Sequence, residues 1–295
     1  MGRGHRYGQV KHVIQSAIAL ILSLQGRNAA AQPPEPAGQP LAPVGQVVDV
    51  APTNKREQLE KDLQNPLSTL IRIPVRYTSN FEVGPEERTQ HQIDLLPAYP
   101  FALGQLNVIT RADLPIISYP DPEDSDGRVT GLGDMTLTAY AAPTQLRDLL
   151  AGLGPAFLFP TATDDVLGSG QWAIGPSLAV LGQPDHWSFG AMATQYWSFA
   201  GDDDRPDINK LEIEPILSYR LGGGISLNYD GVITADWERS AGNTWTLPVA
   251  GTVSYLLATE LPMQLAGGGG VNVIRPDGAA DWYLRLQLNV AMPGG

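Results

Sequence analysis

The sequence predicts an all-β protein: a transmembrane, antiparallel, up-and-down β-barrel of about 12 strands. Three observations support this fold class. Apolar and polar residues alternate with a period of two along many segments, as in a strand with one apolar and one polar face. These segments run for about ten residues or more, the length of a tilted strand that crosses a bilayer, whereas soluble strands have about five or six. The 295 residues contain no continuous apolar run of the roughly 18 residues that a spanning helix needs.

The first 31 residues have the layout of a secretory signal peptide. Arg3, Arg6 and Lys11 form a basic start, residues 12–24 form a short apolar run, and small alanines precede Gln32. Such a segment is too short to span a membrane stably and is removed after export. A retained N-terminal anchor is the alternative. Without its four basic side chains, the chain carries a net charge of −16, which does not suit a nucleic-acid-binding protein.

Residues 32–65 are predicted to form a periplasmic leader with a short helix at its end. Residues 32–53 are rich in Pro, Ala and Gln, which favours an extended chain. Residues 54–64 are charged and helix-prone, with Asn54 as a candidate N-cap. The helix is expected either below the barrel or inside its mouth.

Residues 66–295 are predicted to form the barrel. In residues 282–290 the even positions hold only apolar residues, and the odd positions hold Tyr, Arg, Gln and Asn. Residues 225–238 show the same alternation. Strands are predicted near 68–79, 90–100, 105–118, 132–142, 150–160, 171–181, 187–199, 210–221, 225–238, 244–257, 262–274 and 281–292. An even strand number is typical of single-chain bacterial barrels.

The connections between the strands predict which barrel end faces outside. If the signal peptide delivers the N-terminus to the periplasm, the odd-numbered connections are external. These are residues 80–89, 119–131, 161–170, 200–209, 239–243 and 275–280. Several are long or acidic, whereas the even-numbered connections are mostly tighter, and this asymmetry is typical of such barrels. The Gly-rich loop 161–170 is expected outside and could fold inward to narrow the pore.

Aromatic residues cluster at both predicted strand ends, as they do at membrane interfaces. A soluble β-sandwich with aromatic core corners is the alternative, and the strand lengths argue against it. The outer ends hold Trp172, Trp197, Trp237, Trp245 and Trp282, and the inner ends hold Tyr99, Tyr140, Trp187, Tyr219 and Tyr255.

Six segments carry a family resemblance. They are NPLSTLIRIPVRYTSNFEVGP (65–85), GLGDMTLTAYAAP (131–143), GPAFLFPTATDDVLGSGQWAIGPSLAVL (154–181), QYWSFAGDDDRPDINKLEIEPILSY (195–219), WTLPVAGTVSYLL (245–257) and RPDGAADWYLRLQLNVAMP (275–293). Over roughly residues 56–293 the chain resembles the outer-membrane transporter family filed as "MetA-pathway of phenol degradation", also mislabelled neuromedin U. The resemblance implies an outer-membrane barrel, sometimes tied to the degradation of aromatic compounds, and no catalytic residues. The chain departs from it at residues 292–295, which lack the terminal aromatic residue of many such barrels.

Charged residues on the predicted inward face are candidates for a pore lining, because charges at membrane depth must face water or each other. Arginines from the first and third predicted strands are expected to oppose glutamates from the eighth across the lumen. The alternative is a self-satisfied network that fills a narrow barrel, since 12 strands lie between the filled and open sizes. The candidates are Arg72, Arg76, Asp94, Arg111, Asp113, Glu212, Glu214, Arg220, Asp230, Asp236 and Arg285.

The acidic loop 201–209 offers oxygen ligands of the kind that calcium takes. Asp202, Asp204 and Asp207 are the candidates, although their spacing does not follow the helix-loop-helix calcium motif. The alternative is a solvated loop that faces lipopolysaccharide. No cofactor is otherwise expected, and the absence of cysteine excludes disulfides, thiolate metal sites and a cysteine nucleophile.

A lipid hydrolase is the enzymatic alternative, because a twelve-stranded barrel could hold a Ser–His pair at its surface. His91 has no nearby serine in the sequence, and His186 lies beside Ser188 in a predicted inner turn. Catalysis needs geometry rather than adjacency, so these residues do not decide the matter. Because a fold alone does not confer chemistry, the protein is not expected to be an enzyme.

The function predicted from these patterns is that of a porin-like channel in the outer membrane of a Gram-negative bacterium. It would allow passive uptake of small solutes, aromatic compounds such as phenols or aromatic acids among them. The expected partners are outer-membrane lipids, lipopolysaccharide and the solute. The alternative is a structural or surface-interaction barrel whose lumen is plugged by residues 32–65 or by salt bridges.

Overall fold

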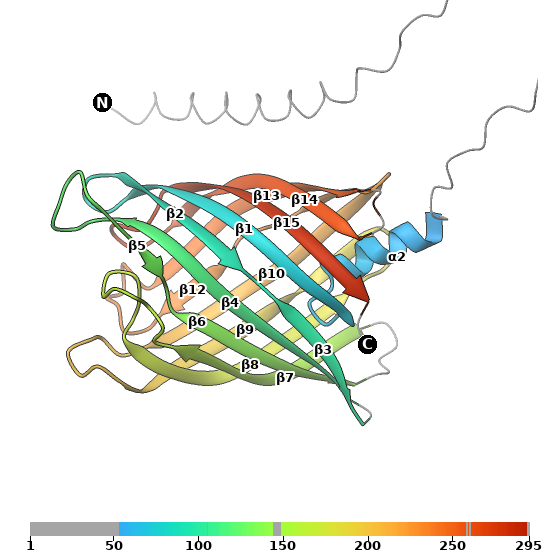
Figure 1. The fold of residues 1–295 in the computed structure, drawn as a ribbon, viewed down its shortest axis with the longest axis horizontal. Coiled ribbons are helices and arrows are strands. Elements are labelled where there is room, and N and C mark those ends of the chain that lie inside the picture. Colours follow the sequence, from blue (N-terminus) through green and yellow to red (C-terminus); the bar gives the residue numbers. More distant parts are fainter. Residues whose placement is uncertain (1–52, 105, 144–148, 258, 260, 294–295) are drawn as a thin grey trace, which may run out of the picture. The chain divides into compact units, whose positions relative to one another are not determined.

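A computed structural model describes residues 53–104, 106–143, 149–257, 259 and 261–293. The predicted signal peptide and most of the predicted leader lie outside the described residues, so both remain predictions. The described chain forms one short helix and one antiparallel sheet that closes into a barrel (Figure 1). None of its helices is long and apolar enough to cross a membrane.

Fifteen strand segments form the barrel wall. They are β1 (Leu70–Val83), β2 (Arg88–Leu95), β3 (Ala98–Leu103), β4 (Leu106–Pro120), β5 (Arg128–Leu132), β6 (Met135–Pro143), β7 (Leu149–Phe159), β8 (Gln171–Gly182), β9 (Trp187–Gly201), β10 (Asn209–Gly222), β11 (Ile225–Asn228), β12 (Ile233–Asp236), β13 (Trp245–Leu257), β14 (Met263–Ile274) and β15 (Trp282–Pro293).

Three of the predicted strands are interrupted, which is why 15 segments make 12 barrel strands. β2 and β3 both pair with β1 and β4, β5 and β6 both pair with β4, and β11 and β12 both lie between β10 and β13. The first break falls at Pro97, which has no N–H to donate to the ladder. The pairing of β1 with β15 closes the sheet, so the predicted count of 12 strands is confirmed.

The two faces of the wall follow the predicted alternation. Large apolar side chains point outward, and several are more than half exposed, such as Leu153, Val249 and Leu286. Trp172 and Trp197 lie near one end of their strands, and Trp187 lies near the other. The apolar belt and these tryptophans match the outer surface of a barrel that faces lipid. Tyr140, which was also predicted at the membrane interface, is instead buried and hydrogen-bonded to Ser177 inside the barrel.

Facing glycine–proline pairs interrupt the ladder in the middle of two neighbouring strands. Pro155 of β7 lies directly opposite Pro176 of β8, and each proline follows a glycine. Neither proline can donate a backbone hydrogen bond, and the regular pairing with the flanking strands is broken at both sites. Gly154 and Gly175 leave room for the neighbouring backbone to approach, since a Cβ at either would overlap with a carbonyl oxygen of the next strand.

The helix α2 (Thr53–Gln64) precedes the barrel and begins one residue before the predicted range. Asn54 therefore lies in the first turn and is not the N-cap. The C-terminal half of α2 enters the barrel mouth at the end where β10 meets β11 (Figure 1). Leu63 packs there against Leu256 and Ala291. Of the two predicted positions for the helix, the structure therefore selects the mouth.

Candidate functional site

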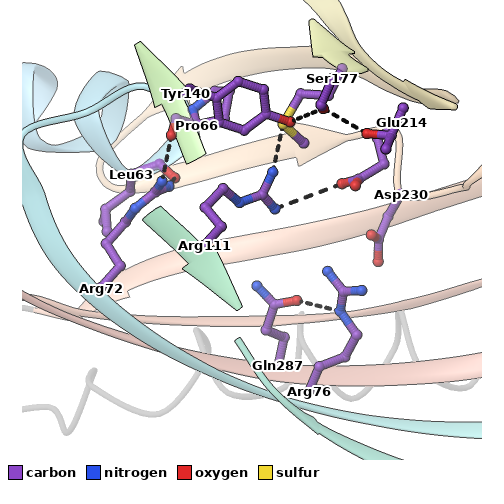
Figure 2. A network of polar contacts seen from close by, with 12 residues as sticks. Leu63, Pro66, Arg72, Arg76, Arg111, Tyr140, Ser177, Glu214, Asp230 and Gln287 are labelled. Atoms are coloured by element: carbon purple, nitrogen blue, oxygen red, sulfur yellow. Dashed lines mark hydrogen bonds and ion pairs between the residues drawn. The ribbon is translucent and has the colours of Figure 1, made fainter. Parts of the chain in front are cut away.

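The predicted charged residues occupy the inner side of the wall. Those in strands alternate with exposed apolar neighbours. Arg72 precedes Ile73, and Arg76 lies between Val75 and Tyr77; these three neighbours are 36%, 40% and 38% exposed. Asp230 lies in the break between β11 and β12. Several of these side chains converge inside the barrel, as Figure 2 shows. The alternation therefore puts the charged side chains on the inner face of the wall, and tertiary contacts determine which groups they bind.

Arg111 of β4 lies at the centre of this network. Its Nη1 donates to the sulfur of Met192 at 2.6 Å, and its Nη2 lies 3.9 Å from Glu214 Oε2 on β10 (Figure 2). Arginines were expected to oppose glutamates across the lumen, and among the described residues this is the only such pair that forms an ion pair. Glu212 instead pairs with Lys210 of its own strand at 2.7 Å. Arg72 donates to the carbonyl oxygens of Leu63 and Pro66.

Four of the other charged candidates have a side-chain partner nearby. Arg285 pairs with Asp230 at 2.9 Å, and Asp236 pairs with Arg239 at 2.8 Å. Asp94 is buried and accepts from Gln92. Among the described residues Asp113 Oδ1 is buried with no hydrogen-bond partner. Ion pairs therefore neutralise only part of the charge on the inner wall, and the lumen is intermediate between an open charged pore and a filled network.

A chain of hydrogen-bonded side chains, all uncharged except the arginine at one end, crosses the inner wall, and the sequence reasoning missed it. Each link is a hydrogen bond of 2.6–3.3 Å, and the chain spans β1, β15, β14, β13, β11 and β10. The recurrence of Asn and Gln at inward strand positions was the signal in the sequence that could have revealed this chain. The members, in order around the wall, are Arg76, Gln287, Asn289, Gln264, Ser254, Asn228 and Ser218. We call them the amide chain.

All seven members of the amide chain line one internal cavity of about 200 Å³. This space has room for several water molecules or a small solute. Glu214 and Asp230 also line it, together with apolar groups such as Met192 and Ile216. Leu63 and Gln64 of α2 border the same cavity. The polar lining and the docked helix therefore belong to one site.

Polar contacts hold α2 in the mouth. Arg56 Nη2 donates to the carbonyl oxygens of Gly223 at 2.7 Å and Leu256 at 3.0 Å. Gly224 has a φ of +88°, and a side chain there would occupy the space of the Arg56 guanidinium. At the other end of the helix, Gln64 Oε1 accepts from Arg220, which is one of the predicted lumen residues. Residues of α2 thus bind three separate parts of the barrel rim or inner wall.

Burial of Glu60 makes the docking of α2 sensitive to pH. Glu60 is 1% exposed and Oε2 has no hydrogen-bond partner among the described residues. Desolvation raises the pKa of Glu60 above its ordinary value of 4.5, while Arg56 and Arg220 act in the opposite direction. A released helix would hydrate Glu60 and restore the ordinary pKa. Docking is therefore favoured when Glu60 is protonated, and this stabilisation is lost as the pH rises through the raised pKa.

We expect the mobility of α2 to increase as the pH rises above the ordinary pKa of Glu60 and through its raised pKa. The chain has no cysteine, so a Lys55→Cys variant can carry one spin label on the exposed side of the helix. The label should sharpen as the pH rises, and Glu60→Gln should remove most of the change. Asp62, whose pKa burial also raises, would supply a change of the same sign. An unchanged pH profile in Glu60→Gln would contradict this explanation.

The loop 161–170 folds over the inner wall at the barrel end opposite α2. Gly131 lies on the inner face, since its neighbour Leu132 is outward and 48% exposed. Thr163 occupies the space above Gly131 and accepts a hydrogen bond from Leu132 N at 3.0 Å. Arg205 donates to the carbonyl oxygen of Asp165 at 2.8 Å and so joins this loop to the next. The lumen is thus narrowed by a loop at one end and by a helix at the other.

The predicted calcium ligands take part in loop hydrogen bonds. Asp202 accepts from the backbone N–H of Asp204, and Asp207 accepts from Ser198 Oγ, each at 3.0 Å. In the part of the chain that the structure describes, no group of three or more His, Cys, Asp or Glu side chains could hold a metal ion. The structure therefore does not bring Asp202, Asp204 and Asp207 together as a metal site.

The structure pairs a different serine and histidine from the two that lie close together in the sequence, His186 and Ser188. Ser188 is fully buried and binds Gln64 and Arg220, and no hydrogen bond to His186 occurs among the described residues. Strand pairing instead brings Ser79 Oγ to 3.1 Å from His91 Nδ1, on the outward face. Tyr77 contacts the same nitrogen at 2.9 Å. A nucleophilic serine needs a base that a third group orients, and no carboxylate or amide contacts His91 in the described residues.

Comparison with known proteins shows the fold. No protein-family model and no curated protein matches the chain. An outer membrane channel from Pseudomonas putida F1 aligns with a TM-score of 0.57 and 15% identity, over 76% of this chain and 96% of that one. The KdgM porin, in complex with disordered oligogalacturonate, aligns at 0.44 and 10% identity, over 75% and 98%. Outer membrane phospholipase A from Escherichia coli aligns at 0.46 and 11%, over 81% and 98%.

At these identities the similarity concerns the fold alone, and the two lower TM-scores support no functional argument. The chain has the fold of outer-membrane β-barrels. Its resemblance to the phenol-degradation family stays a prediction, because no family model matches.

Proposed function

We propose that this protein is a channel of the outer membrane of a Gram-negative bacterium, through which small hydrophilic solutes pass without an energy source. The observation that supports this most is the polar inner wall around a cavity of about 200 Å³, inside a barrel with an apolar outer belt. Inward Asn, Gln and Arg side chains offer hydrogen bonds to polar solutes that pass along the wall. The fold shared with the Pseudomonas putida channel is consistent with this role.

Aromatic acids and phenols are included among the proposed solutes. The sequence resemblance suggests them, and the cavity offers both apolar contacts, such as Met192 and Leu217, and hydrogen-bonding groups. Outer-membrane lipids and lipopolysaccharide are the proposed neighbours of the outward belt.

We expect the purified, refolded chain to conduct ions in a planar bilayer and to admit small solutes into liposomes. The swelling assay would compare phenol, benzoate and 4-hydroxybenzoate with a large oligosaccharide that a cavity of this size excludes. Barrel folding is checked first, by the change in gel mobility on heating. A folded barrel that neither conducts nor admits any of the three small solutes would rule out the channel.

A plugged barrel without transport is the second candidate, and the docked helix α2 specifically favours it. The helix borders the cavity and its buried residues close part of one mouth. The two candidates differ in one respect: a plugged barrel conducts only after α2 is removed, whereas a channel already conducts with α2 in place and conducts more without it. That experiment is described in the Discussion.

A further inference from the structure

Arg76 is the cation of the cavity lining that has no anionic partner. Of the described residues that line the cavity, only Arg76 carries a positive charge. No carboxylate lies within ion-pair distance of its guanidinium in the described chain. Asp94 stands opposite Arg76 on β2, but its carboxylate is buried and accepts from Gln92. The buried carboxylate of Asp113 acts on Arg76 only through longer-range electrostatics. The guanidinium therefore has no ion-pair partner among the described residues and is available to a solute.

The orientation of Arg76 leaves its best donors free. Its Nε donates to Gln287 Oε1 at 2.9 Å, and this is the hydrogen bond that fixes the side chain (Figure 2). The two terminal nitrogens have no hydrogen-bond partner among the described residues. A guanidinium presents such a pair of N–H groups in a planar fork that matches a carboxylate. Gln287 is itself held by Asn289, so the fork is positioned before a ligand arrives.

The rest of the cavity selects against a second charge. The amide chain offers uncharged donors and acceptors along the wall next to Arg76, and these suit hydroxyl groups. The two carboxylates of the lining, Glu214 and Asp230, already pair with Arg111 and Arg285 from behind. Arg76 is the one cation in the described lining, so a second carboxylate would find no cation there.

We propose that the cavity contains a binding site for a small monocarboxylate that carries hydroxyl groups. The terminal nitrogens of Arg76 hold the carboxylate, and the amide chain holds the hydroxyl groups. This inference rests on the proposed channel function and adds the class of solute that the channel retains on its way through. Arg76 thus acts as a specificity residue.

The test is a matched series of six-carbon solutes with no, one and two carboxylates: glucose, gluconate and glucarate. Each is added to the full chain in a planar bilayer, and the concentration that halves the ion current is measured. Gluconate is expected to block about tenfold more tightly than glucose, since one charge-assisted bidentate contact distinguishes them. Glucarate is expected to block more weakly than gluconate.

Arg76→Gln should remove the preference for gluconate over glucose. Arg76→Lys should restore part of the preference. Arg128→Gln is the matched control, because Arg128 is exposed on the outward face of β5 and should leave all three values unchanged.

The outcomes separate the two proposals. A folded wild-type barrel without conductance would overturn the channel itself. A conducting wild-type barrel that does not prefer gluconate, or an Arg76→Gln variant that keeps the preference, would overturn the site and leave the channel standing. Equal block by gluconate and glucarate would overturn the restriction to one carboxylate. The wild-type series decides the proposal even if Arg76→Gln fails to fold.

Discussion

Deleting residues 53–64 is expected to raise the single-channel conductance of the barrel several-fold. The deletion removes α2, whose buried residues Glu60 and Leu63 occupy the mouth, and opens the cavity that Leu63 and Gln64 border. The barrel wall should still close, because the pairing of β1 with β15 begins only at Leu70. Single-channel recording in a salt gradient is the measurement, after heat-modifiability confirms that the variant is folded.

Two point variants control for the deletion. Arg56→Ala removes the hydrogen bonds to Gly223 and Leu256 and should give an intermediate increase, through more frequent openings. Lys55→Ala changes an exposed residue of the same helix and should have no effect. Unchanged conductance after the deletion would show that α2 does not occlude the lumen, and the plugged barrel would then be wrong. A folded deletion variant that remains silent would instead show that side chains inside the barrel close it.

Gly175→Ala is expected to prevent normal folding of the barrel or to destabilise it strongly. An added Cβ would overlap with the backbone carbonyl of Gln195 on β9, and a backbone atom cannot move aside as a flexible side chain can. Overpacking of this kind typically costs about 1–3 kcal/mol and occasionally more. The effect is steric, since Gly175 does not have a positive φ. The measurement is the refolding yield in detergent micelles, together with urea unfolding.

Gly251→Ala is the matched control within a strand. A Cβ at Gly251 meets only the carbonyl oxygen of Asn228, at an ordinary distance of 3.7 Å. Replacing a strand glycine without a clash should be neutral or should stabilise the barrel by up to about 1 kcal/mol, because glycine loses more chain entropy on folding. Equal stability of the two variants would contradict the close approach of β8 and β9 at Gly175.

The strands were predictable because their signal is local. The alternation in residues 282–290 depends only on successive side chains pointing to opposite faces, and β15 has the predicted position within one residue at each end. The interrupted strands were harder to predict. Residues 225–238 alternate except at Gly231 and Val232, and they divide into β11 and β12 at this point, where the Tyr229 hydroxyl donates to Pro248 O at 2.8 Å. That contact joins two strands, so the alternation within one strand does not reveal it.

The sequence alone also placed charged residues on the inner wall, but it paired them incorrectly in part. Glu212 was expected to face an arginine across the lumen, and it binds Lys210 two residues away. Ser79 and His91 seemed unrelated, and the pairing of β1 with β2 places them 3.1 Å apart. In both cases the missing information was the register between strands and the direction that a long side chain takes inside the barrel.

The sequence by itself therefore determined the fold class, the number of strands and the inward face of the charged residues, because the period of two is a property of every strand separately. Only the tertiary structure decided that α2 enters the mouth, that loop 161–170 folds inward and that Arg76 joins the amide chain. These features depend on contacts between inward residues of strands that are distant in the sequence. Such contacts follow from the closure of the barrel, which no single strand encodes.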